Sequence, residues 1–316
     1  MVWKTVDSAA ERELLLTAWR EKNPQRLLHF LRCMPPLSLP DQRRLEEEAL
    51  MAWGAKELVP AFEFACRHHG EYQAADRLLR EWLDRDLDTG LQLLTHHLLP
   101  ESIRPGDPAE LSWVLKDPAK VCAKLVTMRN ALPSVRNTDQ LWVGTMVGVR
   151  PDDQRRAFIG AAFQKWAGSD PTASTAFIQS LRGADASAAL NGVCGSLPIP
   201  EAARLLETFP RPESVELAAP EFTKRWAETD FPAALKWCGE NLPPAAGDGC
   251  LVRLGIELRN GLPVEDAALR QSLEDFPWWA WQRMIEPGLH NQELELHLRL
   301  LPLAPNDETL RNLAKA

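Results

Sequence analysis

The chain has 316 residues, 45% of them hydrophobic and 25% charged, and these ordinary proportions exclude wholesale disorder. The formal net charge is −8, with 36 basic residues scattered among 44 acidic ones. This disfavours nucleic acid as the main partner, because phosphate binding needs clustered Lys and Arg.

Helical periodicity runs along the chain, whereas strand signals are nearly absent and Tyr occurs once. The clearest helix covers residues 71–85, in which polar and apolar side chains occupy opposite faces. Its apolar stripe consists of Ala74, Ala75, Leu78, Leu79, Trp82 and Leu83. The pattern predicts an all-α protein whose amphipathic helices each bury one face.

A Trp-x-x-x-[Asp/Asn]-Pro motif recurs along the chain. It is complete at Trp19/Asn23, Trp113/Asp117 and Trp166/Asp170, and related sequences follow at Trp226/Asp230 and Trp82/Asp86. Proline cannot continue the preceding helix, but it suits the first position of the next one, and Asp or Asn before it is a good N-cap. The motif therefore predicts a corner between two helices, with the indole filling the space beside it.

The tryptophans also set the period of the chain. Trp19, Trp53, Trp82 and Trp113 are 34, 29 and 31 residues apart, and the next two intervals, to Trp166 and then to Trp226, are about twice as long. Each long interval predicts a degenerate unit, one around Trp142 and one across residues 185–210. We expect hairpins at 8–34, 41–69, 71–99, 108–132, 139–166, 171–196, 200–229 and 232–260.

These hairpins predict a single helical-repeat domain over residues 1–316, an α-solenoid of about eight units plus a cap at 264–316, with an irregular joint at 99–108. The array resembles the tetratricopeptide and HEAT class of α-solenoids. In style it is similar to uncharacterised bacterial helical-repeat proteins in which Trp-x-x-x-Asp-Pro recurs. The likeness covers roughly residues 8–260 and implies a superhelical scaffold with a concave binding face. The chain departs from the tetratricopeptide pattern, because Trp ends the first helix and the period drifts.

Motifs for phosphate cradling, nucleophilic catalysis or metalloprotease chemistry do not occur in the sequence, so we expect neither an enzyme nor a cofactor. The residues His29, Cys33, Cys66, His68, His69, His96 and His97 form no compact zinc motif, and no metal is expected. Residues 84–90 resemble the start of a calcium loop but lack its glutamate, so Asp86 is interpreted as an N-cap. Residues 245–250 are interpreted as an interhelical turn in preference to an anion site.

The most unusual segment carries Trp278, Trp279, Trp281 and Arg283. Three tryptophans within four residues cannot share one helical face. They either form a capping core or expose a partner contact, and Trp and Arg are common in interfaces.

The leading hypothesis is a non-enzymatic scaffold that binds a protein or peptide along a concave groove of stacked second helices, with a basic partner favoured by the acidic charge. One alternative is a HEAT-like, DNA base glycosylase-like enzyme that uses the aspartates and tryptophans of the corners. The other is a subunit of a larger assembly, such as a homo-oligomer joined through Trp278–Trp281.

The localisation expected is the cytoplasm. No apolar run is long enough to span a membrane, and the first residues lack the apolar core of a signal peptide. Six cysteines without a Cys-x-x-Cys pair suit free thiols in a reducing compartment.

Overall fold

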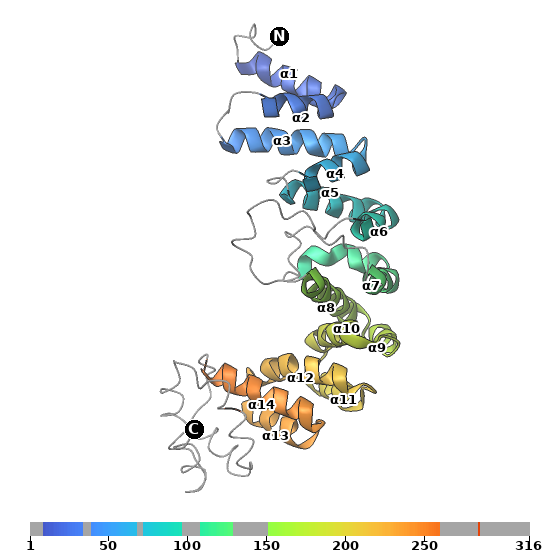
Figure 1. The fold of residues 1–316 in the computed structure, drawn as a ribbon, viewed down its shortest axis with the longest axis vertical. Helices are drawn as coiled ribbons and strands as arrows, with labels where there is room; N and C mark the ends of the chain where they lie inside the picture. The colour runs from blue at the N-terminus through green and yellow to red at the C-terminus, as the bar shows by residue number, and fades with distance from the viewer. Residues whose placement is uncertain are drawn as a thin grey trace. The chain divides into compact units, whose positions relative to one another are not determined.

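The computed structural model describes residues 9–33, 39–67, 72–96, 108–128, 151–259 and Met284. Fifteen helices and no strand are found in these residues (Figure 1), so the predicted all-α class is confirmed. None of the helices in this described part has both the length and the apolar character that crossing a bilayer requires. The chain divides into two compact units, Met1–Pro105 with Thr127–Val147 and Gly106–Val126 with Gly148–Ala316, here called unit 1 and unit 2.

The described residues of unit 1 form three pairs of helices. The pairs are α1 (Ala9–Lys22) with α2 (Pro24–Cys33), α3 (Leu39–Gly54) with α4 (Leu58–Arg67), and α5 (Tyr72–Arg85) with α6 (Leu87–His96). We call α1, α3 and α5 the first helices and α2, α4 and α6 the second helices. Each helix packs on the next one in the chain, and α3 also packs on both α1 and α5.

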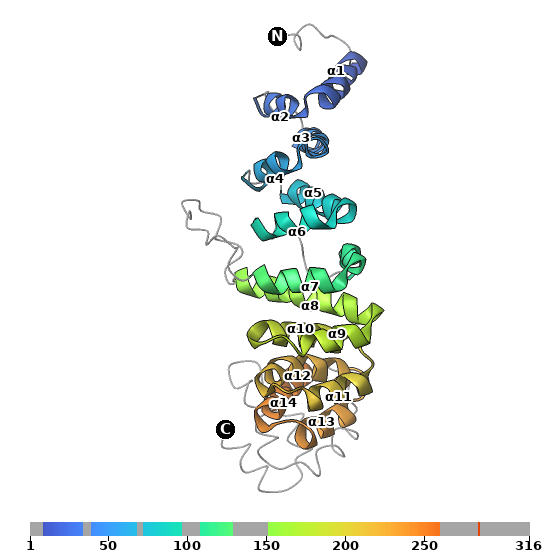
Figure 2. The same cartoon turned by 90° about the vertical axis from the view of Figure 1, so that its right-hand side faces the viewer.

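Unit 2 opens with the 3-10 helix η2 (Pro108–Lys116) and α7 (Pro118–Thr127), and η2 packs on α8. The later helices are α8 (Pro151–Ser169), α9 (Pro171–Ile178), α10 (Gly183–Ser196), α11 (Ile199–Thr208), α12 (Pro212–Ala227), α13 (Phe231–Glu240) and α14 (Pro244–Arg259). The first helices α8, α10, α12 and α14 pack successively on one another (Figure 2). The second helices α9, α11 and α13 each pack on the first helices before and after them.

The hairpin ranges predicted after residue 139 differ from those in the structure by one helix. The corner at Asp170 joins α8 to α9, and the corner at Asp230 joins α12 to α13. Counted from these corners, the described hairpins after residue 139 are 151–178, 183–208 and 212–240. The predicted ranges were wrong because the hairpin α10–α11 lacks the recurring tryptophan. Ser196 occupies the position where the period would place it, 30 residues after Trp166 and 30 before Trp226.

The first helices of unit 2 approach each other through small residues. A methyl group added to Gly192 of α10 would overlap the carbonyl oxygen of Gly160 in α8. A methyl group on Gly168 would lie 3.1 Å from the hydroxyl oxygen of Ser196. The glycine- and alanine-rich sequence of α10 therefore lets two helix backbones touch, which larger side chains would prevent.

Candidate interaction surface

The corner between α8 and α9 shows how the repeated motif works. The backbone N–H of Asp170 donates to the carbonyl of Trp166 over 2.8 Å and completes the last turn of α8. The Asp170 carboxylate accepts a hydrogen bond of 2.9 Å from the N–H of Ala173, the third residue of α9. One residue thus ends the first helix and caps the second, whose own first position is the proline.

The same cap recurs at the other motif positions in both units. The side-chain oxygen accepts from the N–H three residues later at Asn23 (3.1 Å), Asp86 (3.3 Å), Asp117 (3.1 Å) and Asp230 (3.0 Å). Trp53 has Glu57 at this position, and there the indole N–H donates to the Glu57 carboxylate over 3.0 Å. The recurring acids and amides are therefore engaged in local hydrogen bonds.

Each of four motif tryptophans packs on an aromatic ring eleven residues later. The ring centroids are 4.9 Å apart for Trp19–Phe30, 5.5 Å for Trp53–Phe64, 5.4 Å for Trp166–Phe177 and 5.6 Å for Trp226–Trp237. This contact joins the first helix of a hairpin to its second helix. This aromatic contact was not predicted, although the recurring spacing Trp-x10-[Phe/Trp] in the sequence indicates it.

The motif tryptophans are buried to different degrees. Trp113 and Trp166 are only 2% and 5% exposed, and Trp53 is also buried. Trp19, Trp82 and Trp226 are half-buried. The three buried rings stabilise the packing between helices and offer little surface to a ligand.

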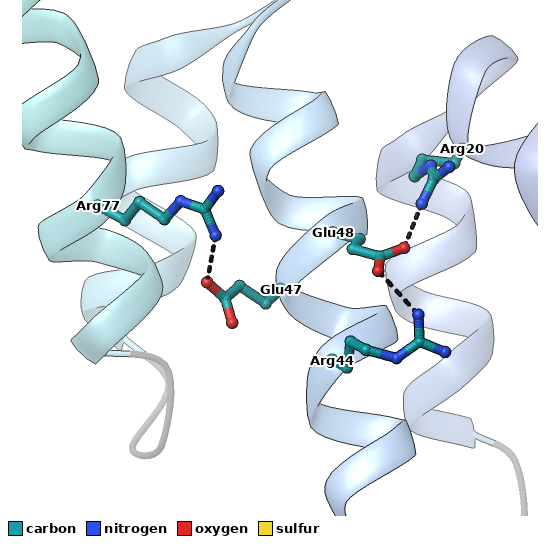
Figure 3. A network of polar contacts seen from close by, with 5 residues as sticks. All are labelled: Arg20, Arg44, Glu47, Glu48 and Arg77. Atoms are coloured by element: carbon teal, nitrogen blue, oxygen red, sulfur yellow. Dashed lines mark hydrogen bonds and ion pairs between the residues drawn. The ribbon is translucent and has the colours of Figure 1, made fainter.

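Ion pairs in unit 1 connect helices that are one hairpin apart. Arg20 of α1 and Arg44 of α3 both bind the Glu48 carboxylate of α3, the latter over 3.1 Å (Figure 3). On the other side of α3, Glu47 binds Arg77 of α5 over 3.0 Å (Figure 3). The charges on this part of unit 1 are therefore paired with each other.

In unit 2 the ion pair that joins the first helices α8 and α10 is more buried. Arg155 of α8 binds Asp185 of α10 over 2.7 Å, and the two side chains are 7% and 1% exposed. Arg225 of α12 donates to the carbonyls of Gly195 and Leu197, just at the end of α10. Burial lowers the pKa of Arg225, although the guanidinium remains charged at neutral pH.

Three buried cysteines of unit 2 are unsuited to act as nucleophiles. Burial raises the pKa of Cys194 to about 12, and it also raises the pKa values of Cys122 and Cys238. Since the thiolate is the reactive form, these three cysteines are protonated and unreactive at neutral pH.

The residues weighed as metal, calcium or anion sites have structural roles where the structure describes them. His29 contacts the edge of the Phe64 ring, with centroids 5.8 Å apart, and the described residues contain no group of three potential metal ligands. The Asp86 carboxylate accepts from the Thr89 hydroxyl over 2.6 Å as part of the cap. Residues 245–250 were wrongly predicted as a turn: they lie inside α14, where Gly247 packs against the carbonyl of Cys238.

Several predicted positions lie outside the described residues. They are His68, His69, His97, Trp142, Trp278, Trp279, Trp281 and Arg283, together with most of the cap at 264–316 and of the joint at 99–108.

One face of α12 carries exposed residues that helix packing does not account for. Leu217 is 63% exposed, and Glu213, Glu216 and Glu221 beside it are exposed as well. Only Glu221 has an ion pair within the described part of the chain, with Arg253 of α14 at 3.2 Å. This face, formed by Glu213, Glu216, Leu217 and Glu221 and called the α12 face below, is the candidate interaction surface.

Comparison of the chain with protein-family models, curated proteins and solved structures gives no significant match.

Proposed function

We propose that the chain is an α-solenoid scaffold of the tetratricopeptide and HEAT type, which binds an extended segment of a partner protein and catalyses no reaction. In this proposal about eight hairpins and a cap at 264–316 form one array in the cytoplasm. A subunit of a larger assembly, such as a homo-oligomer joined through Trp278–Trp281, is an alternative to this proposal.

The observation that supports a scaffold is the use of the recurring residues. At the corners the Asp and Asn side chains cap helices, and the Trp rings pack on aromatic partners. Charged side chains one hairpin apart bind each other, as Arg77 and Glu47 do. Residues engaged in joining helices are unavailable as a reaction centre, so the chemistry left to the outer surface is recognition.

The row of first helices in unit 2 is the surface that we favour for the partner. The groove predicted from the sequence lies on the stacked second helices. In unit 2, however, α8, α10, α12 and α14 pack in an unbroken succession, and a bound segment that crosses them meets one helix after another. Exposed positions on this row include Ala184 of α10 and Glu216 of α12.

The enzyme alternative has little left to support it in the described residues. A base-excising site needs a free carboxylate and accessible rings that can stack on a base. Asp117 and Asp170 instead accept cap hydrogen bonds, and Trp113 and Trp166 are buried.

Site-specific photocrosslinking in an extract of the native cells tests the proposal. The photoreactive residue p-benzoylphenylalanine replaces Ala184 or Glu216 on first helices, or Glu201 or Lys236 on second helices. We expect adducts with a protein chain, and more of them from the first-helix positions. Absence of protein adducts at all four positions would contradict the scaffold, and adducts with nucleic acid would favour the enzyme alternative.

A further inference from the structure

Leu217 differs from the other exposed apolar side chains in its surroundings. The large apolar residues exposed in the described part of the chain are Leu14, Leu15, Val59, Leu115 and Leu217. Among them, only Leu217 has an acidic residue both four positions before it, Glu213, and four positions after it, Glu221. Residues four apart share one side of a helix, so α12 presents a leucine between two carboxylates.

Arg253 of α14 pairs with Glu221, but the cations of α12 itself do not neutralise Glu213 or Glu216, because they bind other groups. Arg225 donates to the two carbonyls at the end of α10, and Lys224 pairs with Glu257 of α14 at 3.6 Å. Glu213 and Glu216 make no ion pair within the described residues. Position in the first turn, where the helix dipole favours an acid, accounts for Glu213, but Glu216 lies beyond it.

We propose that the α12 face is the docking site for a basic segment of the partner protein. The segment places one apolar side chain on Leu217 and Lys or Arg side chains next to Glu213 and Glu216, whereas Glu221 keeps its pair with Arg253. This inference rests on the proposed scaffold function and gives the chemistry of its partner.

Charge selects this occupant over the others. A nucleic acid or a membrane surface with anionic lipids would be repelled by Glu213 and Glu216, which make no ion pair within the described residues. A second copy that docked through the same face would bring Glu213 and Glu216 against their own equivalents, and like charges placed together in an interface are unfavourable. A basic segment forms attractive contacts with Glu213 and Glu216 and covers the exposed leucine.

Selection from a random 12-residue peptide display library on the full-length chain tests this inference. We expect enriched peptides that carry an apolar residue flanked by Lys or Arg. The binding of the best peptide, followed by fluorescence anisotropy, should weaken as salt increases because exposed charges are screened. The triple variant Glu213→Lys, Glu216→Lys, Leu217→Ser should bind this peptide at least about tenfold more weakly.

A matched control separates the α12 face from general acidity. The variant Glu201→Lys, Glu240→Lys, Leu14→Ser changes the same residue types at other exposed positions and should bind as the parent does. Circular dichroism should show the helical content of both variants unchanged. Failure to enrich any peptide, enrichment of peptides without basic residues, or equal loss of binding in the control would overturn the inference.

The two proposals can fail separately. Protein adducts at Ala184 together with unchanged binding by the α12 triple variant would leave the scaffold standing and remove the α12 face. Peptide binding that depends on the α12 face, without protein adducts in the native extract, would leave a basic-peptide site and remove the scaffold function.

Discussion

The ion pairs around α3 in unit 1 and the contact between α8 and α10 in unit 2 join first helices in different ways. In unit 1, α3 is linked to α1 and α5 by ion pairs with exposed or half-exposed side chains, such as Arg77–Glu47 at 61% and 39% exposure. In unit 2, α8 and α10 meet backbone to backbone at Gly160 and Gly192 and share the buried pair Arg155–Asp185. Hairpins of similar length can therefore be joined either by solvent-exposed ion pairs or by direct contact between helix backbones. The second depends far more on individual residues, because exposed pairs are weak and tight interiors tolerate little change.

Asp185→Ala should have the largest effect among the contacts between first helices. The substitution leaves the Arg155 guanidinium buried without its counter-ion, which costs about 3–5 kcal/mol of the free energy of unfolding. Urea unfolding followed by circular dichroism measures the loss. The double variant Arg155→Met, Asp185→Leu is the control. It should recover most of the stability, because Nε and Nη1 of Arg155 have no hydrogen-bond acceptor in the native pair. No recovery would mean that the ion pair itself stabilises unit 2.

Gly192→Ala tests the backbone contact between α8 and α10. The added methyl group meets the Gly160 carbonyl, so the helices must separate at a cost of about 1–3 kcal/mol. Thermal unfolding of this variant is compared with that of Ala184→Ser, an exposed change in the same helix that should have little effect. A Gly192→Ala chain as stable as its parent would show that the two helices do not touch there.

Asp170→Ala should cost about 1 kcal/mol, because it removes the hydrogen bond to the N–H of Ala173 at the start of α9. Asp117→Ala should have a similar effect at the start of α7, where Lys120 N–H is the donor. Chemical denaturation measures both. The variants Asp170→Asn and Asp117→Asn retain a capping oxygen and should keep most of the stability. Equal losses for Asn and Ala would contradict the capping role.

Glu47→Gln should have the smallest effect, below about 1 kcal/mol, because the Arg77–Glu47 pair is exposed. The same urea titration measures it, at low salt and at about 1 M salt, where screening should remove most of the difference. A loss as large as that for Asp185→Ala would show that the Arg77–Glu47 pair within unit 1 is as strong as the Arg155–Asp185 pair within unit 2.

The sequence was informative where the chemistry is local. The corner motif contains both a helix end and a cap within a few residues, so Asp170 and Asp230 could be identified without coordinates. The aromatic partner of Trp166 was missed although it could have been found, because the same spacing of eleven residues recurs at Trp19, Trp53 and Trp226. The pair Arg155–Asp185 spans 30 residues and could not be recognised before α8 and α10 were placed side by side.

Residues with little side chain were the hardest to interpret. The helix α10 is rich in Gly, Ala and Ser, so it has neither a clear amphipathic stripe nor one of the recurring tryptophans. Its small residues are what permits the contact with α8, so the hairpin ranges of unit 2 could not be assigned from the sequence. The α12 face was also missed, because Leu217 fits a helical pattern whether it points inward or outward.

The stability of the Trp166→Ala chain tests the central claim most directly, namely that the recurring residues serve to join helices. Trp166 is 5% exposed and packs on Phe163 and Phe177. Its removal should lower the free energy of unfolding by about 3–5 kcal/mol in a urea titration, as a truncation in a packed core does. A chain that unfolds at the same urea concentration as the parent, yet fails to form adducts with its partner, would contradict the claim and assign the indole to binding.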